Sequence, residues 1–233
     1  LWGVNSLFSC LCTFDINYNF RPKWKPLFID SLAPEDRCHL NGMAFNDNLP
    51  RFVTALSESN EKDGWRKDKM NSGVLIEVPS GRIVLKGLAM PHSPRIFNDI
   101  LYVLESGSGK LLSVDQESGK SVLIYNFKCF VRGMSALNDY LIIGKSKIRD
   151  SSKDFRDLEV KENSNHAGVI IFDLINRKII GEINYESTVE EIFDVQVMEG
   201  MKKPLVLGNK SEKYKQIITF PGNVFWRNDK SKV

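Results

Sequence analysis

The chain has 233 residues and a formal net charge of +3, from 32 Lys and Arg against 29 Asp and Glu. The basic residues are scattered among acidic ones, which argues against nucleic acid or a membrane surface as the main partner. With 42% hydrophobic and 26% charged residues, the composition is that of a soluble globular protein. No apolar run approaches the roughly 20 residues that a membrane span requires.

We expect no signal peptide from the residues at the N-terminal end of this sequence. Residues 1–13 have neither a basic leader nor a small-residue cleavage site, so we expect a cytoplasmic protein. Cys10 and Cys12 stand two positions apart, which places both on one face of a strand. With Cys38 and Cys129, they lack the spacing of a disulfide framework or a zinc site. We predict that Cys10 and Cys12 are small core residues, with metal or redox chemistry as the alternative.

A strand–turn–strand pattern occurs three times along the chain. An Asn-Asp pair lies between two apolar runs at Asn46-Asp47, Asn98-Asp99 and Asn138-Asp139. Asn and Asp tolerate the left-handed backbone conformation that tight hairpins require, so each pair predicts a β-hairpin. The strands after these turns are expected at 51–56, 100–105 and 140–145.

Two further strands follow each hairpin. The third strands, each beginning at a glycine, are predicted at 73–78, 109–114 and 168–173, and the fourth at 82–85, 120–125 and 178–183. Four short antiparallel strands per repeat form the blade of a β-propeller. The Asn-Asp pairs are 52 and 40 positions apart, which agrees with propeller repeats of roughly 40 to 50 residues. A sandwich or a lipocalin-like barrel is the alternative, but neither predicts this signature three times.

Two insertions explain the uneven spacing of the repeats. One is Ser57–Ser72, a polar stretch that carries Trp65, and the other is Ile148–Ala167, which is dense in charge. Both fall between a second and a third strand. We therefore expect both as loops on the same rim of the propeller.

The two ends of the chain take the same repeat pattern. Residues 1–25 match the repeat that contains residues 101–125 at an offset of 100, so the chain is expected to begin at a second strand. Near the other end, Glu190–Val197 is predicted as a first strand and Pro204–Leu207 as its partner. Ile217–Trp226 adds further apolar sequence.

These patterns together predict an all-β fold, a β-propeller of repeated four-stranded antiparallel blades. We expect a single domain over residues 1–233 that is an incomplete propeller, with about four to five blades present where closed rings have about 4 to 8. The blades are expected near residues 1–36, 37–88, 89–129, 130–188 and 189–233.

The first strands of the repeats carry the candidate site. In a propeller these strands line the central channel, and the segments that enter them converge at one mouth. The predicted ligand-binding residues are His39, Asn41, His92, Arg95, Arg132 and Glu105. Arginines there could bind an anion, and imidazoles could act in acid–base chemistry. The alternative is that these polar residues only satisfy backbone groups between blades.

Several strings resemble a bacterial family of conserved hypothetical proteins with a domain of unknown function. They include Glu35–Gly42, Met90–Arg95, Leu104–Gly107 and Glu190–Gln196, and the resemblance covers nearly the whole chain. It implies a longer parent protein with further propeller sequence before residue 1. It implies no activity.

A second, more distant resemblance concerns a metal. The segment Asn41–Phe45 is similar to the Asn-Gly-Leu-Ala-Phe segment of gluconolactonase-like six-bladed propellers, in which the Asn binds a central divalent cation. This resemblance implies that Asn41 is a metal ligand and that Glu191 or Asp194 supplies the carboxylate that a cation such as Ca²⁺ or Zn²⁺ needs.

Three functions follow from these candidates. The first is a binding module whose mouth holds an acidic small molecule, a glycan or a peptide. The second is a metal-dependent hydrolase or lactonase, with a histidine as general base. The third is an interaction scaffold in which the two insertions form the contact surface.

Overall fold

The computed structural model describes residues 1–148, 155, 158–186, 189–201, 208, 211–212, 217–221 and 223–226. These residues belong to two compact units, Leu1–Val197 and Met198–Val233. The single domain expected over residues 1–233 stays a prediction. No helix among the described residues is long and apolar enough to cross a membrane.

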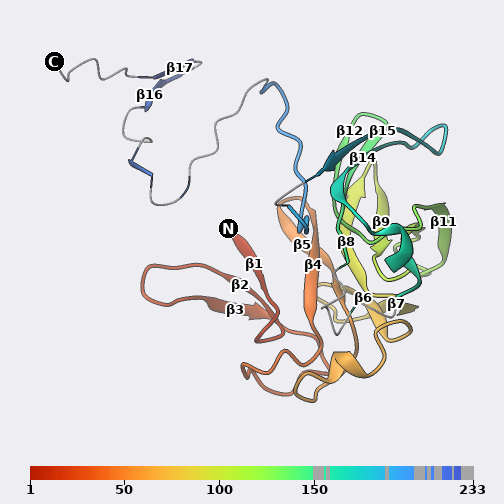
Figure 1. Ribbon diagram of the computed structural model, residues 1–233. Helices are drawn as coiled ribbons and strands as arrows, with labels where there is room; N and C mark the ends of the chain where they lie inside the picture. The colour runs from red at the N-terminus through yellow and green to blue at the C-terminus, as the bar shows by residue number, and fades with distance from the viewer. Residues whose placement is uncertain are drawn as a thin grey trace. The chain divides into compact units, whose positions relative to one another are not determined.

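The first unit is built from four antiparallel sheets arranged like propeller blades (Figure 1). Within each sheet, strands that follow one another along the chain are paired. The first sheet contains β1 (Trp2–Asn5), β2 (Cys10–Thr13) and β3 (Arg21–Trp24). The second contains β4 (Leu40–Asn46), β5 (Leu49–Ala55), β6 (Gly73–Glu77) and β7 (Ile83–Leu88). The third contains β8 (Pro91–Phe97), β9 (Ile100–Glu105), β10 (Lys110–Val114) and β11 (Ser121–Asn126). The fourth contains β12 (Val131–Leu137), β13 (Tyr140–Lys145), β14 (Ala167–Asp173) and β15 (Lys178–Tyr185).

The predicted all-β, propeller-like fold is confirmed, and among the described residues the sheets do not close into a ring. Asn98 and Asp99 both have positive φ, of 48° and 61°, in the turn between β8 and β9. In the first hairpin the turn is formed by Asp47 and Asn48, one residue later than predicted, because Asn46 still belongs to β4. The residues of β1, β2 and β3 lie 100 positions before residues of β9, β10 and β11.

The core lies between successive sheets, because each strand presents alternate residues to its two faces. Adjacent Phe52 and Val53 of β5 are both fully buried but belong to different apolar clusters. Val53 packs with residues of the first sheet, and Phe52 packs with residues of the third. Cys10 and Cys12 are buried with free thiols, which confirms them as core residues, and burial raises the pKa of Cys10 to about 11.

The two insertions share one small apolar core. The first contains the 3₁₀ helix η1 (Gly64–Lys67) and the second contains η2 (Glu159–Asn163). The buried residues of this insertion cluster are Leu56, Trp65, Met90, Phe130, Ile148, Leu158 and Val160. Since Met90 and Phe130 lead into β8 and β12, the cluster lies beside the entry to these strands.

The predicted fifth blade differs from the expectation. Residues 190–197 form no strand but are bound to the fourth sheet by side-chain hydroxyls. The Ser146 hydroxyl accepts from the amide of Ile192 at 2.9 Å, and the Ser135 hydroxyl accepts from the amide of Val197 at 3.2 Å. Residues 204–207 lie outside the described residues. In the second unit, β16 (Ile217–Phe220) and β17 (Asn223–Trp226) form an antiparallel hairpin.

Candidate functional site

The first strands of the sheets, β4, β8 and β12, carry the candidate site. β8 contacts both β4 and β12, and each of the three strands has a bulge in its pairing with the second strand. The bulges fall between Leu40 and Gly42, His92 and Arg95, and Val131 and Met134. A bulge leaves residues unpaired and redirects their side chains, and bulges are enriched next to functional sites. Most of the predicted polar residues lie at or beside these bulges.

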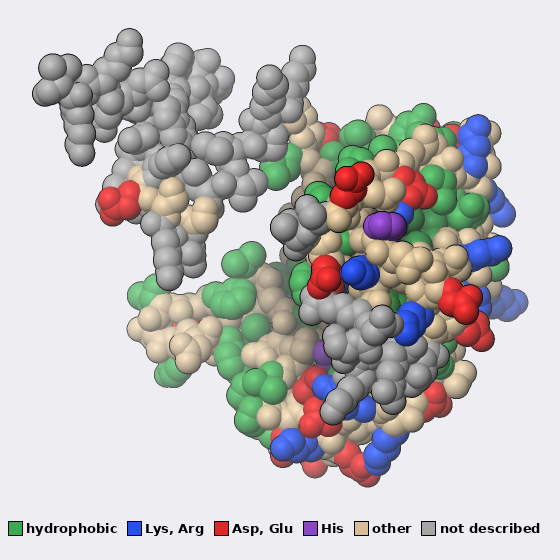
Figure 2. Space-filling view, in the orientation of Figure 1, with side chains coloured by type: hydrophobic (Ala, Val, Ile, Leu, Met, Phe, Trp, Pro, Cys, Tyr) green, Lys and Arg blue, Asp and Glu red, His purple; other side chains and the backbone are tan. Residues whose placement is uncertain are grey.

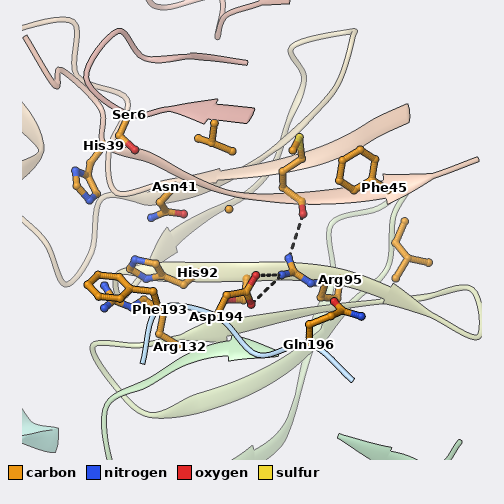
Figure 3. A pocket seen from close by; sticks show the side chains of 15 residues that line it. Ser6, His39, Asn41, Phe45, His92, Arg95, Arg132, Phe193, Asp194 and Gln196 are labelled. Atoms are coloured by element: carbon orange, nitrogen blue, oxygen red, sulfur yellow. Dashed lines mark hydrogen bonds and ion pairs between the residues drawn. The ribbon is translucent and has the colours of Figure 1, made fainter. Parts of the chain in front are cut away.

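A pocket of about 750 Å³ lies between these strands, β1 and residues 193–196. This volume is typical of small-molecule sites. Six of the eight predicted site residues line it, namely His39, Asn41, His92, Arg95, Arg132 and Asp194 (Figure 3). The side chains come from segments up to 155 positions apart in sequence. Glu105 and Glu191 are not among the lining residues.

His39 enters β4 with a fixed ring orientation. Its φ is 50°, and its Nδ1 lies 2.9 and 3.1 Å from the two carboxylate oxygens of Asp36. The same carboxylate accepts a hydrogen bond from Trp65 Nε1 at 3.0 Å, and the Trp65 ring packs against the imidazole at 4.5 Å between centroids. The insertion cluster therefore helps to hold His39 at the edge of the pocket.

His92 is held as a neutral imidazole. Only 7% of it is exposed, and Nδ1 lies 2.9 Å from the carbonyl oxygen of Met90 and 3.0 Å from the Ser106 hydroxyl. Burial lowers the pKa of His92 to about 3, and the charges of Arg132 and His39 act in the same direction. Because a carbonyl only accepts, Nδ1 carries the proton, and Nε2 is then a hydrogen-bond acceptor.

Asn41 and Glu105 both form hydrogen bonds with groups of the neighbouring strands and their ends. Asn41 donates from Nδ2 to the carbonyl of Pro91 at 3.0 Å and accepts from the Thr54 hydroxyl at 2.6 Å. Glu105 accepts from the amide of Ala89 at 2.8 Å at the end of β9. Asn41 thus joins β4 to β8 at the pocket wall, whereas Glu105 stabilises the entry to β8 from outside the pocket.

Arg95 connects four segments of the first unit. Its Nε donates to the carbonyl of Met134 at 3.1 Å, and Nη1 donates to the carbonyls of Met43 and Pro94 at 3.1 and 3.0 Å. Its Nη2 forms a bidentate ion pair with Asp194. Arg95 therefore lines the pocket but directs each of its guanidinium nitrogens to a group of the protein.

Arg132 makes fewer hydrogen bonds than Arg95. Its Nε donates to the carbonyl of Ile192 at 3.2 Å, and its Nη2 lies 3.5 Å from a carboxylate oxygen of Glu191. The guanidinium lies 4.2 Å from the centre of the Phe193 ring, a cation–π contact. Burial lowers the pKa of Arg132, while Glu191 opposes this shift. Arginine nevertheless stays charged in proteins, and among the described residues Nη1 of Arg132 has no hydrogen-bond partner.

The two carboxylates proposed for a divalent cation are paired with arginines. The carboxylates of Glu191 and Asp194 face Arg132 and Arg95, and a cation bound there would lie beside a guanidinium. Within the described part of the chain, no three His, Cys, Asp or Glu side chains are grouped to hold a metal. The cation of the sequence analysis stays a prediction.

Some residues of the site were missed by the sequence analysis. Asp36 orients His39 from three positions earlier, a spacing that could have indicated the pair. Phe193 stacks on Arg132, and the Ser93 hydroxyl accepts from the amide of Gly133 at 2.9 Å. These last two contacts join segments that are 40 or more positions apart, and no local pattern indicates them.

The propeller-like sheets around a polar pocket are an arrangement that suits a binding or scaffold module. Over residues 1–207 the chain matches the model of the family described as Domain of unknown function (DUF4915), and it belongs to this family. No curated protein matches the chain.

Three solved structures illustrate what the chain is similar to. The computationally designed Ika4 protein shares 8% identity over 69% of this chain and 80% of its own, with a TM-score of 0.42. The nidogen/laminin complex shares 10% identity over 76% of this chain and 60% of its own, with a TM-score of 0.43. Apo AztD from Citrobacter koseri shares 16% identity over 77% of this chain and 43% of its own, with a TM-score of 0.31. The chain thus spans less than two thirds of the latter two chains.

Proposed function

We propose that this protein is a ligand-binding module whose pocket holds a small acidic molecule. The observation that carries the proposal is Arg132, whose side chain lines the pocket and is only 17% exposed. Its hydrogen bonds run through Nε and Nη2, which leaves Nη1 as a donor among the described residues. A carboxylate or phosphate that accepts from this guanidinium would form a charge-assisted hydrogen bond, which is stronger than a neutral one.

The size and surroundings of the pocket support a small ligand. Its volume of about 750 Å³ matches a compact molecule better than a long peptide or a polymeric glycan. Positive and negative side chains are interspersed over the visible face of the first unit (Figure 2), so binding of a small acid would depend on the pocket and not on a broad charged surface.

Arg132, not Arg95, is proposed as the anion-binding residue. Arg95 already donates to three carbonyl oxygens and to Asp194. An anion at Arg95 would have to displace Asp194, whereas an anion at Arg132 competes only with Glu191 at 3.5 Å.

Isothermal titration with a panel of small carboxylates and phosphomonoesters tests the proposal. We expect binding of at least one acid to the wild-type protein and a roughly tenfold or larger loss of affinity in Arg132→Gln, as for a hydrogen bond to a charged group. Arg51→Gln is the matched control, since Arg51 pairs with Glu77 away from this pocket. Failure of every acid to bind, or equal affinity in wild type and Arg132→Gln, would contradict the proposal.

A further inference from the structure

Two imidazoles lie beside Arg132 in the pocket, and the proposed anion site does not use them. Figure 3 shows His39, His92, Arg132 and Phe193 at one end of the pocket, with Arg95 and Phe45 toward the other. His39 and His92 both line the pocket, although His39 precedes β4 of the second sheet and His92 lies in β8 of the third.

In both imidazoles Nδ1 faces a hydrogen-bond acceptor of the protein. Nδ1 of His39 faces the carboxylate of Asp36, and Nδ1 of His92 faces the carbonyl of Met90. Carboxylates and carbonyls accept hydrogen bonds, so Nδ1 is the protonated nitrogen in each ring. In a neutral imidazole the other nitrogen, Nε2, has a lone pair and no proton. With both rings neutral, this end of the pocket offers two acceptors next to a guanidinium donor.

A ligand that complements these groups needs donors close to its acidic group. Hydroxyl groups next to a carboxylate meet this requirement. An ammonium group would also donate, but its positive charge would need a carboxylate partner in the pocket. The carboxylate of Asp36 is already bonded to His39 and Trp65, and that of Asp194 to Arg95. A neutral hydroxyl brings no such charge into the pocket.

We infer that the ligand is a hydroxycarboxylic acid, with its carboxylate on Arg132 and its hydroxyl groups donating to Nε2 of His39 and His92. This inference rests on the proposed function and adds the chemical class of the ligand. The aromatic face of Phe193, which is 69% exposed, lies beside the guanidinium and can contact the carbon skeleton.

Four acids of the same carbon skeleton test the inference by isothermal titration. Succinate carries no hydroxyl, malate carries one and tartrate carries two, and aspartate has an ammonium group in place of the malate hydroxyl. We expect affinity to rise from succinate to malate to tartrate, by roughly two- to tenfold per hydroxyl. We expect aspartate to bind no better than succinate.

Variants separate the contribution of the hydroxyls from that of the carboxylate. In His39→Phe, which keeps an aromatic ring against Trp65, we expect the gain from succinate to tartrate to shrink. His92→Phe should shrink the same gain, and Arg132→Gln should weaken all of the acids.

The outcomes distinguish the two proposals. Equal binding of succinate, malate and tartrate, or tighter binding of aspartate than of malate, would overturn the hydroxyl inference and leave the acid site standing. An undiminished preference for tartrate in both histidine variants would also overturn the inference. Failure of all four acids to bind would overturn it together with the proposed use of the pocket for small acids of this kind.

Discussion

Arg95 and Asp194, 99 positions apart in sequence, form a bidentate ion pair with Nη2 2.9 and 3.1 Å from the two carboxylate oxygens. The same guanidinium donates to the carbonyls of Met43 in β4 and Met134 in β12. One side chain of β8 thus connects its two neighbouring first strands and the segment after the fourth sheet. The side chain of Arg95 is 23% exposed and that of Asp194 is 60% exposed, so most of the stability should come from the carbonyl contacts.

Arg95→Gln should lower the free energy of unfolding by about 3 kcal/mol, because carbonyls that accept from the guanidinium lose a charged donor. Asp194→Asn should cost less than about 1 kcal/mol, as is usual for a solvent-exposed ion pair. Urea denaturation of both variants measures the difference. Similar losses in the two variants would show that the ion pair, and not the bonds to Met43 and Met134, provides the stability.

His92 should make the protein less stable as the pH falls below neutrality. Its pKa is about 3 in the folded protein, lowered first by burial and then by the charges of Arg132 and His39, whereas an unfolded histidine titrates near 6.5. Below pH 6.5, His92 therefore binds a proton in the unfolded chain but stays unprotonated in the folded chain until the pH falls to about 3. From pH 7 to pH 5 this lowers the free energy of unfolding by about 2 kcal/mol.

The control for the pH prediction is His92→Asn, whose side-chain amide could still donate toward the Met90 carbonyl but does not titrate. Urea denaturation of both proteins between pH 7 and pH 5 gives the comparison. The stability advantage of the wild type should shrink as the pH falls. An advantage that stays constant over this range would show that the pKa of His92 is not lowered.

Gly133 should be more sensitive to substitution than its backbone angle alone implies. Its φ is +83°, and a Cβ atom at this position would lie 2.6 Å from the Cα of Asp194. Gly133→Ala should therefore displace the segment that carries Phe193 and Asp194. We expect a loss of several kcal/mol in the free energy of unfolding, or a folded protein with weakened acid binding.

Gly87→Ala is the matched control for Gly133→Ala. Gly87 has a similar φ of +76°, but the nearest atom to an added Cβ is the Asn71 carbonyl oxygen at 3.9 Å. It should show only the cost of a left-handed alanine, about 1 to 2 kcal/mol. Equal losses of stability in the two variants, with normal acid binding in both, would contradict a close contact between Gly133 and the backbone of Asp194.

Trp65 should couple the two insertions. It is 3% exposed in the insertion cluster, so Trp65→Ala should cost about 3 to 5 kcal/mol. Hydrogen exchange should become faster in the segment around η1 and also in η2, which lies more than 90 positions later. Trp65→Phe keeps much of the packing but removes the donor to Asp36, and it should have a smaller effect. Unchanged exchange in η2 of Trp65→Ala would contradict a shared core.

Much of the fold was predictable because its signals are local. The residues of β9 and β13 are those predicted, since an apolar run and the Asn-Asp turn before it act over a few positions. The wrong prediction concerns residues 190–197, which have a suitable strand pattern but bond to the hydroxyls of Ser135 and Ser146. A strand also requires a partner strand, and the pattern of one segment cannot supply it.

The repeat also indicated which polar residues come together, because equivalent positions of neighbouring blades lie close in space. Asn41, His92 and Arg132 line one pocket for this reason. The repeat did not indicate which hydrogen bonds each predicted site residue makes. Glu105 points to the amide of Ala89 instead of the pocket.

The strands, the hairpins and the repeat could be predicted from the sequence, because they depend on apolar runs and turn chemistry between near neighbours. The folded chain was needed to show that Arg95 joins several segments while Arg132 keeps a donor, and that the deeply buried His92 is neutral. Hydrogen bonds and desolvation depend on which distant groups surround a side chain, and only the folded chain brings those groups together.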